Sequence, residues 1–386
     1  MENILKKYLL DNWDKFEMGK KPEDLILSKF AERGIRAPEV SIITYLATGL
    51  TRGKETPLLI LRTPKLATNP QALASLETEF NNLTAILKEL RDKKILKTIP
   101  APIFLENIHS LRVLCMAFLA GQPLSKKMIS ENILKTTAAN FQLAFGWLSG
   151  FQKKLGAAEK AAAAEVAARV IGTYERSFPK KPARAQYFSK IRKLAEQFPA
   201  KDIPVLAQHA DFHAENVFLE QGRVSGVIDW EDFDVRGVPA FDLYHFIYTY
   251  FEALFATFSH AGNADLLEMF SAGEPVIKAV RSVVREYFQE MGLRPELAQV
   301  LVPLYLAHSV CLAGSPRKQA QHAMKKLEIL LELCPLSLAD LLLAMTVFNW
   351  SALAKKAQAD GDQKLAQYCA AKKNEILKQA ELRKSS

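Results

Sequence analysis

Cysteine is scarce in this sequence, and its four cysteines lie far apart along the chain. Cys115, Cys311, Cys334 and Cys369 form no CxxC pair. Closely spaced cysteines are typical of disulfide frameworks and of zinc sites. We therefore expect free thiols in a reducing compartment, and neither a disulfide framework nor a structural zinc ion.

Long apolar runs are missing as well. The most apolar stretch, residues 330–350, contains Glu332, Pro335 and Asp340, whereas a membrane helix needs about 20 nearly uninterrupted apolar residues. The first 16 residues carry charges throughout and lack the apolar core of a secretory signal. We therefore expect a cytoplasmic protein with no membrane partner.

Runs of like charge are absent too. The formal net charge is +9, but Lys and Arg are scattered and no run of five or more occurs. A basic excess without a concentrated patch favours an ordinary basic surface over a nucleic-acid site. We expect no nucleic-acid partner, since such a role would depend on net charge alone. The 386 residues, 49% of them hydrophobic, are enough for two or three domains.

The hydrophobic pattern divides the chain into a β-rich start and a helical remainder. Residues 1–32 have apolar residues at helical spacing and predict charged amphipathic helices. Two β-rich runs within 40–62, a helix over 70–92 and two more strand-like runs predict a small, mostly antiparallel sheet with one helix. We assign residues 1–121 to this first domain.

The remaining chain predicts helices with one hairpin among them. Residues 122–350 form the second domain, in which VFLE and VSGVID flank a QGR turn within 204–230 and predict the hairpin. Residues 351–386 predict a separate charged helix. The expected fold class is therefore α+β, with a small sheet domain followed by a larger helical domain.

The predicted hairpin brings three polar residues to one place. Asn216 precedes its first strand, Asp229 ends its second, and Asp211 lies five residues before Asn216. Carboxylate and carboxamide oxygens are ligands that Mg²⁺ accepts. Phosphoryl transfer uses such a metal together with a separate carboxylate that orients the acceptor hydroxyl. Taken singly, each residue is more often a helix cap or a turn residue.

This segment resembles the aminoglycoside phosphotransferase and choline kinase-like family, whose pattern is HGDxHxxN followed by GxxDW. The matching positions are His209, Asp211, His213, Asn216, Gly226, Asp229 and Trp230. Ala210 stands where the family usually has Gly. The resemblance implies a protein-kinase-like bilobal fold, with a small antiparallel-sheet N-terminal lobe and a larger, mainly helical C-terminal lobe.

The resemblance also implies a role for each polar residue. Asp211 would be the catalytic carboxylate, Asn216 and Asp229 would bind Mg²⁺, and Asp242 would brace the loop from the start of a helix. The two histidines of the motif have no third ligand nearby in the sequence, so we interpret them as hydrogen-bonded loop residues and not as zinc ligands. Trp230 is expected to be a core anchor.

In the first domain, the resemblance implies a cation on the third strand that pairs with a helical glutamate and contacts the ATP phosphates. The family's Lys position holds Arg62, with Lys65 three residues later, and Glu79 is the expected partner. Arg keeps the positive charge and binds phosphate. The TGLTRG segment, residues 48–53, is the candidate phosphate cover, and MAFLAG, residues 116–121, is the candidate adenine hinge.

We therefore expect an ATP- and Mg²⁺-dependent phosphotransferase that acts on a hydroxyl of a small molecule, such as an aminoglycoside, choline or an amino sugar. Asp232 and Asp234 would favour a cationic acceptor, although solvated loop carboxylates are commoner. The alternative is a catalytically weak nucleotide-binding pseudokinase or scaffold, which Arg62 motivates. A protein kinase is disfavoured because the chain lacks HRD and DFG segments, and because the thirteen residues from Asp229 to Asp242 are too few for a usual activation loop.

Overall fold

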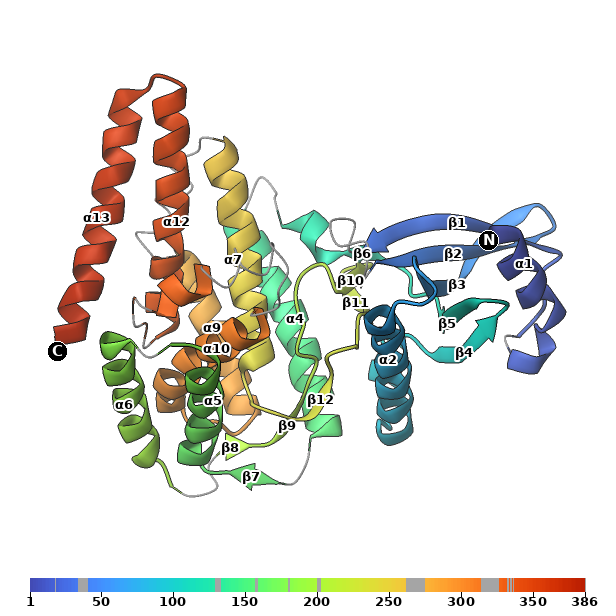
Figure 1. Ribbon diagram of the computed structural model, residues 1–386, viewed down its shortest axis with the longest axis horizontal. Helices are drawn as coiled ribbons and strands as arrows, with labels where there is room; N and C mark the ends of the chain where they lie inside the picture. The colour runs from blue at the N-terminus through green and yellow to red at the C-terminus, as the bar shows by residue number, and fades with distance from the viewer. Residues whose placement is uncertain are drawn as a thin grey trace. The chain divides into compact units, whose positions relative to one another are not determined.

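The computed structural model divides into two compact units, which Figure 1 shows and which are described separately. The sheet unit comprises Met1–Gln122 and Asn216–Phe233, and the helical unit comprises Pro123–Glu215 and Asp234–Ser386. The expected α+β class, with a small antiparallel-sheet unit and a larger helical one, is confirmed. The three domain ranges stay a prediction. The structure describes residues 1–17, 19–33, 41–128, 133–156, 159–179, 181–199, 203–261, 275–313, 326–331, 333, 335 and 337–385.

An antiparallel sheet of five strands, in the order β1-β2-β3-β5-β4, forms the centre of the sheet unit. Its strands are β1 (Asp24–Arg33), β2 (Ile42–Thr51), β3 (Lys54–Pro64), β4 (Pro102–Ile108) and β5 (Leu111–Ala117). The unit also contains the helices α1 (Glu2–Asp11), α2 (Pro70–Glu89) and α3 (Lys93–Leu96), and the short helix η1 (Asp14–Phe16). The predicted hairpin is β10 (Val217–Glu220) with β11 (Arg223–Val227), and it joins β6 (Gln122–Pro123) in a second sheet.

The sequence-based expectation of helix throughout residues 1–32 is wrong for β1. This segment pairs with β2 in an antiparallel register that runs from Asp24 opposite Leu50 to Arg33 opposite Ile42. Leu25 is buried and Leu27 partly buried, which gives the segment an apolar face at strand spacing as well. Strand β2 begins nine residues after β1 ends, and pairing with it overrides the local helical pattern.

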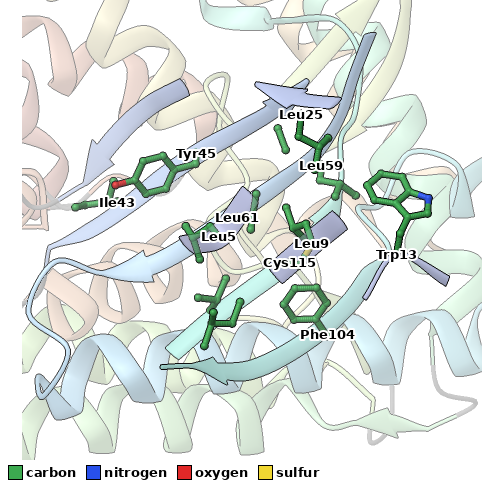
Figure 2. Close-up of a cluster of buried hydrophobic side chains, with 13 residues drawn as sticks. Leu5, Leu9, Trp13, Leu25, Ile43, Tyr45, Leu59, Leu61, Phe104 and Cys115 are labelled. Atoms are coloured by element: carbon green, nitrogen blue, oxygen red, sulfur yellow. The ribbon is translucent and has the colours of Figure 1, made fainter. Parts of the chain in front are cut away.

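Side chains on opposite faces of the central sheet meet different helices. The face that carries Leu59 and Leu61 packs against Leu5 and Leu9 of α1 and against Trp13, and Figure 2 shows this cluster. Because side chains alternate along a strand, the next residue on β3 points to the other face, which α2 covers. That residue is Arg62.

The helical unit contains the longer helices of the chain. They are α4 (Ile133–Leu155), α5 (Ala163–Ser177), α6 (Pro182–Glu196), α7 (Phe241–Ala261), α9 (Pro275–Glu290), α10 (Ala298–Ala313), α12 (Leu338–Ala359) and α13 (Gln363–Ser385), with the short helices η3 (Leu124–Lys127) and η4 (Pro295–Leu297). Two small sheets pair β7 (Lys160–Ala161) with β8 (Ile203–Pro204) and β9 (Leu206–Gln208) with β12 (Asp234–Gly237). Aromatic rings of α4 and α7 in T-shaped and tilted pairs form part of its core.

One described segment has the length and composition of a membrane-spanning helix. This segment, Pro295–Leu312, is 61% buried inside the unit, and α10 within it packs against α5, α6 and α7. An apolar helix that is mostly buried is typical of a protein core. Among the cysteines, Cys115, Cys311 and Cys369 are free, and Cys334 lies outside the described residues.

Candidate active site

A buried ion cluster occupies the face of the central sheet that α2 covers. The guanidinium of Arg62 hydrogen-bonds the carboxylate of Glu79, and its Nη1 lies 3.6 Å from Oδ1 of Asp229. The side chains of Arg62, Glu79 and Asp229 are only 8%, 1% and 7% exposed. Glu79 falls within the buried stripe of α2, between Leu76 and Leu83. A charged residue in such a stripe needs a partner, and Arg62 provides it.

The hairpin of β10 and β11 places Asn216 beside the residues that precede Asp229. The strands pair with Val217 opposite Val227, and the backbone N–H of Ile228 donates to the carbonyl of Asn216 at 3.0 Å. Both predicted metal ligands are buried, each with 6% of its surface exposed. Asp229 has a φ of +74°, a left-handed conformation that costs a residue with a Cβ atom about 1–2 kcal/mol.

Helix α2 also holds the segment that follows Asp229. Asn82 Nδ2 donates to the carbonyls of Trp230 at 2.8 Å and Glu231 at 3.2 Å. About two turns earlier on the helix, the hydroxyl of Ser75 hydrogen-bonds the carboxylate of Glu231. The indole of Trp230 is fully buried and donates to Val227, as expected of a core anchor. These contacts fix the backbone on which Asp229 adopts its strained conformation.

Two other sequence-based candidates lie apart from this ion cluster. Lys65 is exposed and pairs with Glu32 at 2.6 Å. Hydrogen bonds from Lys29 and from Lys65 lower the pKa of Glu32 to about 2. The TGLTRG segment turns at Arg52 and Gly53, where β2 meets β3. That turn is nine residues from Arg62 along β3, or roughly 30 Å of strand, which does not support a role as phosphate cover, and this role stays a prediction.

The residues of the sheet unit fit a hard divalent cation. Asn216 offers a carboxamide oxygen and Asp229 a carboxylate, and both side chains are buried at the open end of one hairpin. Mg²⁺ is commonly held by one or two such ligands while waters and phosphate oxygens fill its other positions. Within the described part of the chain, no cluster of three His, Cys, Asp or Glu side chains offers a different metal site.

The helical unit places Asp211 between two imidazoles. Its Oδ2 lies 3.4 Å from Nε2 of His213, and its Oδ1 lies 3.4 Å from Nε2 of His245. Burial alone would raise the pKa of Asp211, but hydrogen bonds and charge from the two histidines outweigh it and hold the pKa well below the ordinary value. Asp211 is therefore a carboxylate at neutral pH, as a group that orients a hydroxyl must be.

Asp242, at the start of α7, holds the loop of residues 209–215, which we call the Asp211 loop. Its two carboxylate oxygens accept the backbone N–H groups of His209 at 2.7 Å and Ala210 at 2.8 Å. Burial raises the pKa of Asp242 to about 7, although these two hydrogen bonds oppose the shift. Ala210 has a φ of +68°, which explains why a Gly suits this position.

Sequence reasoning missed His245 and Tyr305. His245 lies three residues after Asp242 on α7, and its Nδ1 is 3.3 Å from the hydroxyl of Tyr305 on α10. The spacing of three residues puts Asp242 and His245 on one helix face, which is the signal that the sequence offered. Asp232 and Asp234 are exposed, and the Asp234 carboxylate accepts the backbone N–H of Arg236.

The comparisons with known proteins agree with the motif. A sequence model of the phosphotransferase enzyme family matches residues 45–279, a range that includes every predicted site residue. No match was found among curated protein sequences. The expected enzyme class, a small-molecule kinase, is confirmed by the family match.

Several solved structures are similar over more than four fifths of the chain. A thermostable mutant of the aminoglycoside phosphotransferase APH(4)-Ia, in a ternary complex with ADP and hygromycin B, is 14% identical, with a TM-score of 0.39, covering 97% of this chain and 98% of that one. The macrolide 2'-phosphotransferase MphH from Brachybacterium faecium is 17% identical, with a TM-score of 0.47 and coverages of 82% and 98%. The amicoumacin kinase hAmiN, in complex with AMP-PNP, Ca²⁺ and Ami, is 13% identical, with a TM-score of 0.45 and coverages of 87% and 94%.

The family assignment depends on the sequence match, which spans more than half of the chain and ends well beyond the Asp211 loop. The chain belongs to the phosphotransferase enzyme family.

Proposed function

We propose that this phosphotransferase uses ATP and Mg²⁺ to phosphorylate a hydroxyl group of a small molecule. The observation that carries the proposal is the buried cluster in which Arg62 contacts both Glu79 and Asp229. Apolar residues of similar volume would pack at least as well as these buried charges, so packing alone does not explain them. A cation held beside a metal-binding carboxylate is, however, what phosphate binding requires.

The proposed roles follow from the chemistry of each side chain. Arg62 contacts the nucleotide phosphates and Glu79 orients it, while Asn216 and Asp229 hold Mg²⁺. When bound, the Mg²⁺ ion would neutralise charge on the phosphates. The Asp211 carboxylate accepts the hydrogen bond of the acceptor hydroxyl and takes its proton as the oxygen attacks the γ-phosphorus and ADP leaves. A role for Lys65 stays a prediction, and its pairing with Glu32 does not support it.

The acceptor is proposed to be a polar small molecule, of the aminoglycoside, choline or amino-sugar kind that the family resemblance implies. The helical unit contains a hollow of about 240 Å³ whose lining includes Gln208, Asp234, Phe241 and His308. Gln208 directly precedes the Asp211 loop and Phe241 precedes Asp242. Arg169 lines the hollow as well, so both signs of charge are present and the acceptor's charge is left open.

Nucleotide binding is the first test. Calorimetric titration with AMP-PNP should give micromolar binding that requires Mg²⁺ and weakens at least tenfold in Asp229→Asn. Asp234→Asn is the matched control, because it removes an exposed carboxylate five residues away and should bind as the wild type does. Binding that ignores Mg²⁺, or that is equal in both variants, would contradict the proposed metal site.

Turnover is the second test, measured as ADP release in a screen of cationic sugars and amino alcohols. Asp211→Asn should lower kcat by about 10² to 10⁴-fold and keep nucleotide affinity. Unchanged turnover would remove Asp211 from the mechanism.

The alternative, a nucleotide-binding protein with little catalysis, is favoured by one observation. Arg62 replaces the Lys of the family and contacts Asp229 directly, so its guanidinium competes with a metal ion for that carboxylate. This alternative predicts nucleotide binding without phosphate transfer to any acceptor in the screen. It also predicts that Arg62→Lys restores no transfer.

A further inference from the structure

The two imidazoles beside Asp211 present the same nitrogen to it. His213 Nε2 and His245 Nε2 each lie 3.4 Å from a different oxygen of the carboxylate. A carboxylate oxygen has two lone pairs, so one hydrogen bond from an imidazole does not by itself exclude a second donor. Contact with both imidazoles is therefore compatible with a role for Asp211 in orienting a hydroxyl.

A second hydrogen bond on each ring selects the tautomer. Nδ1 of His213 accepts the backbone N–H of Glu215 at 3.2 Å. Nδ1 of His245 lies 3.3 Å from the hydroxyl of Tyr305. A neutral imidazole whose Nδ1 accepts a hydrogen bond carries its proton on Nε2, and that is the nitrogen that faces Asp211 in both rings.

Tyr305 is suited to act as the donor to His245. The side chain is buried, and burial raises the pKa of its hydroxyl well above the ordinary value, although a hydrogen bond with Ser309 opposes the shift. The phenol therefore stays protonated over the physiological range. Because the serine hydroxyl donates to the phenol oxygen, the phenol proton is available for Nδ1 of His245.

The two histidines differ in what they are attached to. His213 belongs to the Asp211 loop itself and moves with it. His245 belongs to α7, where it shares a face with Asp242, whose carboxylate holds the backbone of His209 and Ala210. Helix α7 thus holds the loop backbone through one side chain and the Asp211 carboxylate through another.

We propose that His245 is a positioning residue for phosphoryl transfer. Its imidazole, in the tautomer that Tyr305 selects, orients the Asp211 carboxylate from α7. The inference rests on the proposed role of Asp211. Several titratable or charged groups surround this pair. They are His213 on the loop, Asp242 and Glu252 on α7, Tyr305 and His308 on α10, and Arg169 on α5.

Hydrolysis of Mg²⁺·ATP, with water in place of the acceptor, provides the activity test. His245→Phe should lower kcat by about tenfold to a hundredfold, the loss expected when a reacting group is misplaced by about 1 Å, with KM for ATP nearly unchanged. His245→Gln keeps an N–H donor and should recover most of the rate. His109→Gln is the control, since it removes a histidine at the exposed turn between β4 and β5, in the sheet unit and not in the unit that contains Asp211.

The pH profile tests the role of Tyr305. The imidazolium form of His245 carries a proton on both nitrogens, so it donates to Asp211 whether or not the tyrosine hydroxyl is present. The neutral form does so only in the selected tautomer. Tyr305→Phe should therefore lose more activity on the alkaline side of the profile than on the acid side. A uniform loss at all pH values would indicate a merely structural role for Tyr305 and overturn the tautomer argument.

Carbon-13 NMR of the Asp211 carboxyl group tests the contact without any activity. Its signal is assigned by its absence from Asp211→Asn, and its titration is followed over the pH range in which the protein stays folded. The midpoint should rise in His245→Phe, because one of the two groups that lower the Asp211 pKa has gone, and should stay unchanged in His109→Gln. Identical titrations in wild type and His245→Phe would overturn the inference.

The hydrolysis assay also separates this inference from the proposed function. If Asp211→Asn abolishes hydrolysis while His245→Phe retains the full rate, the positioning role is wrong and the role of Asp211 stands. If Asp211→Asn hydrolyses ATP at the wild-type rate, the proposed function of Asp211 fails, and the positioning role fails with it.

Discussion

Glu77 and Glu79 lie two residues apart on α2 and meet opposite environments. Glu79 is 1% exposed and bonds the buried Arg62, whereas Glu77 is 54% exposed and pairs with Arg112 at 3.2 Å. Removing one partner of a buried ion pair leaves an uncompensated charge in the interior, while an exposed pair contributes little.

We expect Glu79→Gln to lower the free energy of unfolding by about 3 kcal/mol, and Glu77→Gln to lower it by less than about 1 kcal/mol. Urea denaturation followed by circular dichroism measures both. Equal losses in the two variants would show that burial of the Arg62 pair does not govern its contribution.

Ala210 combines a side chain with a backbone conformation that favours glycine. Relief of its left-handed φ should offset the extra freedom that glycine gives the unfolded chain. We expect Ala210→Gly to leave thermal stability unchanged or to raise it by up to about 1 kcal/mol.

Ala207→Gly, in β9, is the matched control for this substitution. Its φ is not positive, so glycine should cost about 1 kcal/mol there. The prediction for Ala210 fails if calorimetric melting shows both variants destabilised alike.

At the scale of elements, α7 makes the stability of the helical unit depend on pH. Burial raises the pKa of Asp242 from 3.8 to about 7, so the folded chain binds more protons than the unfolded chain between about pH 4 and pH 7. The contribution of this carboxyl group to stability is therefore full below about pH 4 and is lost as the pH rises to 7. Desolvation lowers the pKa of His308 from 6.5 to about 4, which acts in the opposite direction.

The effect of Asp242 is therefore measured as a difference between variants. The free energy of unfolding of the wild type, minus that of Asp242→Asn, should decrease steadily from pH 4 to pH 7. His308→Gln, measured in parallel, removes the opposing contribution and should make the decrease of stability steeper. If the free energy of unfolding changed with pH in the same way in the wild type and in Asp242→Asn, the carboxyl group would have the same pKa in the folded and unfolded states.

The elements also show which parts of the site the sequence predicts. The hairpin that brings Asn216 and Asp229 together was predictable, because its strands and its turn are adjacent in the chain. Strand β1 was not, since the pairing that defines it is with β2, whose paired residues lie between 9 and 26 positions away. His245 meets Asp211 only because α7 folds back over the loop, and it meets Tyr305 only because α10, sixty residues later, packs beside α7.

At the scale of the whole molecule, the sheet unit is built from two stretches of chain. Residues 216–233 supply fully or nearly fully buried side chains, among them Val217, Leu219, Val227 and Trp230. They also supply Asp229, which pairs with Arg62, and the N–H of Val227, which bonds the carbonyl of Thr98 at 2.7 Å. A fragment of residues 1–122 would lack these buried side chains, the Asp229 carboxylate and the N–H of Val227.

We expect the fragment 1–122 to show no cooperative thermal transition, because it lacks part of the core and leaves the buried Arg62–Glu79 pair uncovered. A second fragment, with residues 216–233 joined to Gln122 by a flexible glycine–serine linker, should melt cooperatively. The same fragment carrying Trp230→Ala is the control. A cooperative transition in 1–122 alone would mean that the second stretch is dispensable for folding.

The interrupted path of the sheet unit has a consequence for synthesis on the ribosome. The chain leaves this unit at Gln122 and returns only at Asn216, so nearly a hundred residues of the helical unit emerge first. At bacterial or eukaryotic elongation rates, this delay is on the order of ten seconds. During that time the Arg62–Glu79 pair lacks Asp229 and the carbonyl of Thr98 lacks the N–H of Val227, and we expect a nascent chain in this state to bind a ribosome-associated chaperone.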